Sequence, residues 1–436
     1  MLKVKNQQSK IKNYFTYLIV LFPILGQYGF LTRSVTFADI FLVIGLSYLI
    51  LKMISTRKVE IADKKFAIFT IWYIIISIIM SLCIANIFSI SSITGCIKCT
   101  VYALAILLIS GKYIDMEKVV KIYSVIVIVL SALIFIQQIQ YLITGTISPW
   151  VINSKLFPAV YVNDDYFSGG YLTQLGGDTF RSASIFSEPA LFAQYVCPCL
   201  VLNIFYVKNK YQKYAIMSIA TLATLMTKSA NGIVYVCVIW LFALIYNLVK
   251  FIQARKRSIK VTNILLMALI ILIPIVFFTT TSNQITTRSS SLISRIEEIS
   301  DPKGETSGSM RVVRGWKIYA GLQSVEKIFG IGEGNIVNYL NLHPTIVTMF
   351  SEAYNGYMSG LPAIFVNSGL IGGMLFLVWW LFTFIKGRNV VKGLLIFLML
   401  YLLASSSLFT SNFVLIIILI ITLANQEKLV KNNEYR

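Results

Sequence analysis

The chain alternates between long apolar runs and short polar connections over its whole length. Most runs hold roughly 18 to 25 mainly apolar residues, the length that an α-helix needs to cross the hydrocarbon core of a bilayer. The pattern therefore predicts an all-α, polytopic membrane protein with about twelve transmembrane helices in a single membrane domain, residues 1–436. The predicted spans are 14–32, 35–51, 66–88, 94–111, 119–143, 186–207, 214–228, 230–249, 261–280, 359–385, 393–409 and 411–426.

Two polar segments are far longer than a connection between spans needs to be, residues 145–185 and 281–357. Loops of this length are usually functional. The first interleaves aromatic and acidic residues, a composition that suits sugar rings and equally suits an aromatic belt at the membrane interface. In the second, apolar residues from Val312 to Phe329 recur every three or four positions, which predicts an amphipathic helix.

Composition and charge narrow the class of protein. With 57% hydrophobic and 13% charged residues, the chain is too apolar for a soluble protein. The first apolar run lacks a small-residue cleavage site behind it and is expected to remain as a span. If the N-terminus is cytoplasmic, the short cytoplasmic connections carry the whole net charge of +20 and the outer loops are neutral. This positive-inside pattern predicts two cytoplasmic termini and leaves no surplus of charge for nucleic acid.

Metal and cofactor chemistry has little support in the sequence. The six cysteines lie in or at the edge of predicted spans, and Cys96 and Cys99 share an apolar helix without a histidine nearby. His343 is the only histidine, and it has no cysteine or second histidine beside it. We therefore expect no metal site and no cofactor.

The segment from Arg181 to Phe192 places charged side chains at a membrane boundary. An ionised side chain near hydrocarbon costs several kcal/mol unless it is paired or faces water, so Arg181 and Glu188 at a helix mouth indicate either a functional site or an interfacial anchor pair. The turn from Thr227 to Gly232 places one further cation, Lys228, beside the outer mouth of the helices.

A second basic group follows the glycine-rich stretch in the 281–357 loop. Arg311, Arg314 and Lys317 are spaced by three, which predicts neighbouring positions on a face separate from the apolar one, with Ser307 or Ser309 as N-cap. Because cations oppose the helix dipole at an N-terminus, their placement favours a phosphate site, the alternative being a helix that faces solvent or lipid headgroups. The sequence from Gly330 to Gly334 follows the helix and predicts a loop turn, not a dinucleotide-binding motif.

The segment from Arg181 to Phe192 looks like the Arg-x-x-Ser-x-Phe-x-Glu-Pro-x-x-Phe run of many bacterial polysaccharide polymerases. Together with the two large loops after the fifth and ninth spans, this run makes the chain resemble the O-antigen and capsule polymerases (Wzy) of the O-antigen ligase and polymerase superfamily. Looser matches lie at Ser229 to Gly232, at Arg311 to Trp316 with Phe329 to Gly332, and at Asn355 with Ser368 to Gly372.

The resemblance implies a metal-independent glycosyltransferase of the membrane-type (GT-C) fold. Its substrate would be an oligosaccharide on undecaprenyl diphosphate at the outer face of the bacterial cytoplasmic membrane. Its partners would be the lipid bilayer, a chain-length regulator and a flippase. Carried over, the glycan- and diphosphate-binding arginines are Arg181 and either Arg311 or Arg314.

Two functions compete with the polymerase. Many O-antigen ligases have a His-Asn pair where this chain has Tyr354-Asn355, a departure that argues against a ligase and leaves the general base unassigned. Tyr354 and Asn355 remain substrate-binding candidates, with Lys228 and Lys317, and Glu188 is the candidate base beside Arg181. A flippase or another transporter is the alternative from a different class, and it would carry its charges near the membrane midplane.

Overall fold

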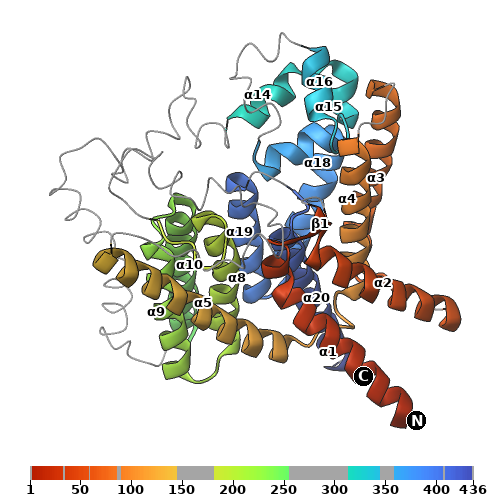
Figure 1. Cartoon of the computed structure of the whole chain (residues 1–436). Coiled ribbons are helices and arrows are strands. Elements are labelled where there is room, and N and C mark those ends of the chain that lie inside the picture. Colours follow the sequence, from red (N-terminus) through yellow and green to blue (C-terminus); the bar gives the residue numbers. More distant parts are fainter. Residues whose placement is uncertain are drawn as a thin grey trace. The chain divides into compact units, whose positions relative to one another are not determined.

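The computed structural model describes residues 2–32, 35–57, 59–85, 90–144, 181–254, 313–343, 358–405 and 408–434, and most of these are helical (Figure 1). Within these ranges, seven helices are long and apolar enough to cross a membrane. They are α2 (Phe37–Thr56), α3 (Lys64–Ala85), α4 (Ile90–Ile109), α5 (Met116–Thr144), α8 (Pro189–Tyr206), α10 (Ala230–Ala254) and α18 (Gly360–Lys386).

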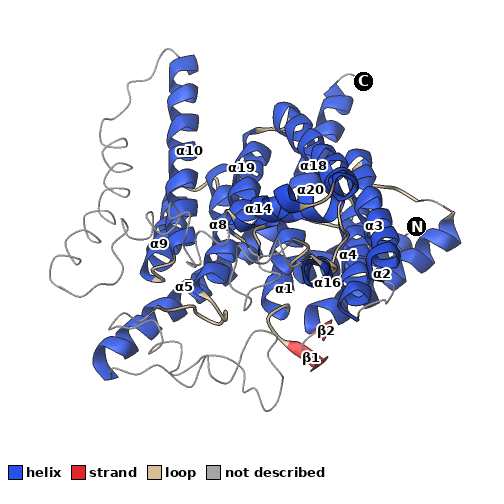
Figure 2. Cartoon of the chain, turned by 90° about the horizontal axis from the view of Figure 1, so that it is seen from above, coloured by secondary structure: helices blue, strands red, loops and turns tan. Residues whose placement is uncertain are grey.

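The chain forms two compact units. Unit 1 comprises Met1–Gly26, Phe37–Val119 and Glu298–Arg436, and it contains α2, α3, α4 and α18. In unit 1, α18 packs on α3 and α3 packs on α4, and the three lie side by side in Figure 2. Its other helices are α1 (Leu2–Leu25), α14 (Arg314–Gly321), α15 (Ser324–Phe329), α16 (Ile336–Leu342), α19 (Asn389–Ala404) and α20 (Ser411–Glu434).

Unit 2 comprises Gln27–Thr36 and Val120–Glu297. It holds most of α5, together with α8, α9 (Lys210–Met226) and α10, and α8 packs against both α9 and α10. It also holds a short antiparallel hairpin, in which β1 (Gly29–Thr32) pairs with β2 (Val35–Thr36) so that Gly29 lies opposite Thr36.

The predicted spans agree well with the helices. Every predicted span except 261–280, which lies outside the described residues, coincides with a helix. Two of these helices, α1 and α9, are not among the seven that are both long and apolar enough to cross, and α19 and the apolar part of α20 are shorter than those seven. The membrane class is therefore supported, and the count of twelve spans stays a prediction.

The first predicted span ends too late. It was expected to continue to residue 32, but α1 ends at Leu25 and Gly29–Thr32 forms β1, which pairs with β2. Gly26 ends the helix in close contact with Ser411, whose Oγ would lie 2.8 Å from an added Cβ. The β-branched and aromatic residues that follow favour extended backbone, so apolar character alone was a poor guide to helix here.

The predicted amphipathic helix is two short helices. α14 and α15 are separated at Leu322, which is extended (φ −61°, ψ 152°) and buried in a cluster with Ile318. The buried face of α14 holds Arg314 and Ile318, whereas Trp316 and Val325, which the apolar period had placed together, are exposed. These short helices are positioned by packing on the longer ones, at one end of α3, α4 and α18 (Figure 1).

Helix α18 is broken at Gly369, whose backbone (φ 68°, ψ −173°) is not helical. A break leaves carbonyl groups without their helical partners, and in an apolar environment each must find another donor. The Gly330–Gly334 loop supplies two donors, from Ile331 N to Val366 O (2.9 Å) and from Gly332 N to Asn367 O (2.9 Å). The loop and the break therefore complete each other.

Glycine is required on both sides of this contact. Gly330 has a φ of +90°, and an added Cβ would lie 2.4 Å from Asn367 O; a Cβ on Gly369 would lie 2.1 Å from Ile328 O. Gly332 and Gly334 also have positive φ, which confirms the turn predicted from Gly330 to Gly334. No other residue allows the two backbones to approach so closely.

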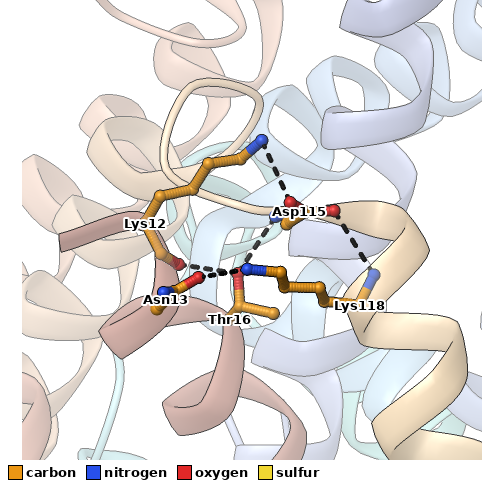
Figure 3. A network of polar contacts seen from close by, with 5 residues as sticks. All are labelled: Lys12, Asn13, Thr16, Asp115 and Lys118. Carbon is orange, nitrogen blue, oxygen red and sulfur yellow. Dashed lines mark hydrogen bonds and ion pairs between the residues drawn. The ribbon is translucent and has the colours of Figure 1, made fainter. Parts of the chain in front are cut away.

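A polar network ties the start of unit 1 to the connection before α5 (Figure 3). Lys12 Nζ lies 3.5 Å from Asp115 Oδ2, which makes an ion pair. The backbone N–H of Asp115 donates to Thr16 Oγ1 (3.0 Å), and Lys118 Nζ donates to Asn13 Oδ1 (2.7 Å). Exposed ion pairs of this kind stabilise by roughly 0–1 kcal/mol each. The network therefore joins the start of α1 to the connection before α5, two segments that the charge pattern assigns to the cytoplasmic side of the membrane.

Topology can be tested with reporter fusions. We expect fusions at Lys58 and Arg257 to report the cytoplasm, because basic residues concentrate in those connections, and fusions at Asp164 and Lys303 to report the outer compartment. A cytoplasmic signal at Lys303 would contradict the assignment of the second large loop.

Candidate functional site

The segment 181–188 runs without helix into α8, and α5 fixes its path. Gln137 in α5 pairs with both backbone groups of Ser184: its Nε2 donates to Ser184 O (2.9 Å), and its Oε1 accepts from Ser184 N (2.9 Å). Ser184 has a φ of +58°, an uncommon value for a residue with a side chain, and its hydroxyl donates to Leu130 O (3.0 Å). The glutamine amide holds this backbone in place.

The neighbouring glutamine ties the same segment to α9. Gln138 Nε2 donates to Ser182 Oγ (3.0 Å) and to Met226 O, the last residue of α9 (3.1 Å). Neither glutamine was predicted from the sequence to be functional. The available signal was a pair of adjacent amides in an otherwise apolar run, because such groups in a span need partners.

The helix start at Glu188 agrees with the prediction. Glu188 is the extended N-cap of α8, Pro189 is its first residue, and Phe186 is buried against Phe192 and Tyr195. The main-chain oxygen of Glu188 accepts the first helical hydrogen bonds, but its side chain makes no capping bond. The half-buried side chain therefore does not cap the first backbone N–H groups, which distinguishes it from an ordinary N-cap.

A tight turn between α9 and α10 presents Lys228. This residue has a φ of +51°, and its N–H donates to Leu225 O (3.0 Å). The buried Thr227 hydroxyl donates to Thr224 O (2.6 Å), and Ser229 Oγ accepts from Gly232 N (3.3 Å) at the start of α10. The turn is thus fixed by its own hydroxyl groups, as a motif of small polar residues favours.

Arg181 and Lys228 are close enough to influence each other. Burial, and next the positive charge of Arg181, lower the pKa of Lys228. Both effects make the charged form of the Lys228 amine less favourable, and this free-energy cost falls on Lys228. An anion bound between or beside them would relieve that cost, and a phosphate or diphosphate also matches the fork of an arginine.

Arg314 of unit 1 differs from its prediction. It is the first residue of α14 and is only 2% exposed, and burial lowers the pKa of its guanidinium. The N-cap is Val313, not Ser307 or Ser309. Lys317 is exposed, so the predicted common basic face is wrong for these two residues. The adjacent Gly315 explains the burial, because α14 lies so near α18 that an added Cβ would meet Pro362 at 2.7 Å.

Several predicted residues lie outside the described part of the chain. They are Arg311, Ser307, Ser309, Tyr354 and Asn355. His343 is described and ends α16, where its ring packs on Tyr339 with centroids 4.4 Å apart.

Glu333 is a further candidate that the sequence analysis did not single out. It lies in the Gly330–Gly334 loop, and its Oε2 accepts from the Tyr73 hydroxyl and from Asn367 Nδ2 (2.7 Å). Burial raises the pKa of this carboxyl, and the two hydrogen bonds oppose that rise. The available signal in the sequence was an acidic residue between two glycines, Gly332 and Gly334, which was interpreted only as part of a turn.

In the part of the chain that the structure describes, no group of three His, Cys, Asp or Glu side chains is placed to hold a metal ion. The chain matches no known family model and no curated protein.

An anion site at Arg181 and Lys228 would bind inorganic diphosphate, and this can be tested with the purified protein. We expect diphosphate to raise the thermal unfolding temperature, and Arg181→Ala to weaken the apparent affinity by roughly tenfold or more, because a charge-assisted hydrogen bond is lost. Arg181→Lys should recover little of it, since the fork is absent. Lys210→Ala, at the opposite end of α9 from Lys228, is the matched control and should bind like the wild type. Equal binding by all variants would exclude the site.

Proposed function

We propose that the protein is a polysaccharide polymerase. It transfers a growing glycan from undecaprenyl diphosphate onto a second lipid-linked repeat unit, in the synthesis of O-antigen or capsule. The observation that carries the proposal is that the positive charge of Arg181 acts on Lys228, a second cation of unit 2, and lowers its pKa. A diphosphate leaving group needs positive charge, and these side chains supply it without a metal.

The membrane setting supports a lipid-linked substrate. Seven apolar helices long enough to cross a bilayer occur among the described residues, and the cationic pair lies in connections beside such helices. We assign the chain to the membrane-type glycosyltransferase fold with twelve spans, in the bacterial cytoplasmic membrane, with both termini in the cytoplasm. The cationic face is then directed toward the periplasm or the cell exterior.

In this proposal each residue has a defined role. The acceptor hydroxyl attacks the anomeric carbon of the donor sugar, the bond from that carbon to the diphosphate oxygen breaks, and the electron pair leaves with the diphosphate. Arg181 and Lys228 stabilise the leaving group, and Glu188 takes the hydroxyl proton. The second arginine site falls on unit 1, at Arg311 or Arg314, with Lys317, Tyr354 and Asn355 as further substrate contacts.

A gel of surface glycan from a deletion strain tests the function. We expect single repeat units in place of long polymer, and restoration of length by the wild-type gene. Complete absence of lipid-A-linked glycan would identify a ligase, and absence of repeat units from the outer leaflet would identify a flippase.

In the same strain, we expect Arg181→Ala and at least one of Arg311→Ala and Arg314→Ala to fail to restore polymer length, and Arg181→Lys to restore it poorly. Because Arg314 is buried, the amount of each variant in the membrane is measured beside polymer length. Full length with all three alanine variants would leave an interfacial anchor as the explanation of these arginines.

Glu188 is tested by two conservative variants. Glu188→Gln keeps the shape and removes the basicity, and we expect it to lower turnover of purified lipid-linked repeat units by roughly a hundredfold or more while substrate still binds. Glu188→Asp keeps the basicity with a shorter reach and should retain a trace of activity. Near-normal turnover by the Gln variant would rule out a base, and lost binding would assign Glu188 to holding Arg181.

A further inference from the structure

Glu333, Tyr73 and Asn367 form a closed triangle of hydrogen bonds in unit 1. The Asn367 amide nitrogen donates toward both Glu333 Oε2 (2.7 Å) and the Tyr73 oxygen (2.9 Å), and the Tyr73 hydroxyl donates to the same Oε2. Three elements therefore meet at a single carboxyl oxygen: α3, the Gly330–Gly334 loop and α18.

The triangle determines which atom remains for a ligand. The single hydrogen of the Tyr73 hydroxyl is used within it. Every side-chain hydrogen bond that the structure describes for Glu333 goes to Oε2. Since Glu333 is not fully buried, Oε1 is the carboxyl atom that remains to accept a hydrogen bond from a bound molecule.

The position of this carboxyl is rigid. Glu333 N donates to Ser77 Oγ (3.0 Å), and the loop on its other side is held by Asn335, which is fully buried and bonds to Ser81 (3.0 Å) and Ser92 (2.6 Å). Gly332 is fastened to Asn367 O at the break in α18. A group held from both sides in this way is preorganised for recognition.

An anchoring role alone does not explain an acid here. A glutamine would accept from Tyr73 and Asn367 equally well, without the cost of burying a charge. Among the described residues, no lysine, arginine or histidine forms an ion pair with Glu333. Glu333 is thus an acid whose hydrogen-bond partners, Tyr73 and Asn367, are both neutral.

We propose that Glu333, oriented by Tyr73 and Asn367, is a hydroxyl-binding site for the acceptor glycan, in which Oε1 accepts a hydrogen bond from one sugar hydroxyl. A hydroxyl donor suits the site, because a carboxylate is an acceptor and sugars offer many hydroxyl donors. The inference rests on the proposed polymerase and adds to it a residue of unit 1 that binds the acceptor.

The kinetic test uses full-length protein in membrane vesicles and lipid-linked repeat units extracted from the deletion strain. We expect Glu333→Gln to raise the half-saturating concentration of repeat units by roughly tenfold or more, with a much smaller change in maximal rate, because a charge-assisted hydrogen bond is lost in binding. Tyr73→Phe, which keeps the ring, should raise it by a smaller factor. Glu60→Gln removes an exposed acid elsewhere in unit 1 and is the matched control.

A second measurement needs no variant to fold. Dicyclohexylcarbodiimide reacts with protonated carboxyl groups in apolar surroundings, and mass spectrometry locates the adduct. In the wild-type protein we expect labelling of Glu333 at mildly acidic pH, and protection from labelling by the extracted repeat units.

The outcomes separate the two proposals. A wild-type protein that does not polymerise repeat units refutes the proposed function. An active wild type whose Glu333→Gln variant keeps the normal half-saturating concentration refutes only the hydroxyl site. An equal loss of maximal rate and of thermal stability, without the change in half-saturation, would assign Glu333 to anchoring the loop. Labelling that repeat units do not block would also overturn the inference.

Discussion

Every backbone amide and carbonyl inside a membrane protein needs a partner within the protein, and the break in α18 shows how this chain meets that requirement. At Gly369 the helix gives up its own hydrogen bonds, and the main chain of the Gly330–Gly334 loop replaces them at Val366 and Asn367. The loop is thereby drawn against helices α3 and α18 by atoms that every residue possesses. Its course depends on this exchange of donors, and so does the carboxyl of Glu333.

In unit 2, side chains and not backbone groups supply the missing hydrogen-bond partners. Gln137 satisfies both polar groups of Ser184 in a segment that forms no regular structure, and Gln138 joins that segment to the end of α9. Broken helices and irregular segments at membrane depth are tolerated where protein covers them, and they are common at substrate sites of transport proteins. In unit 2, the irregular segment 181–188 and the turn between α9 and α10 place Arg181, Glu188 and Lys228 beside apolar helices.

The sequence predicted most of the helices because hydropathy is a local property. It also located Glu188 at the start of α8, since Pro189 favours a first helical turn. It failed where distant residues decide the outcome. The burial of Arg314 depends on the packing of Gly315 against Pro362, and the pairing of Gln137 with Ser184 joins residues far apart in the chain. Neither contact produces a periodic pattern in the sequence. Glu333 could not be identified either, because the residues that orient its carboxyl, Tyr73 and Asn367, are distant in the chain.

In the loop at the break in α18, the backbone fixes the structure and one side chain, that of Glu333, is placed for the proposed binding. Its path is fixed by main-chain hydrogen bonds and by glycines whose backbones touch the helix, whereas the side chain at position 333 points among groups contributed by α3 and α18. Evolution or a protein engineer can therefore exchange that one side chain, together with its neighbours at positions 73 and 367, while the surrounding architecture is retained. Such exchanges at positions 333, 73 and 367 would alter what the proposed site binds without altering the backbone around it.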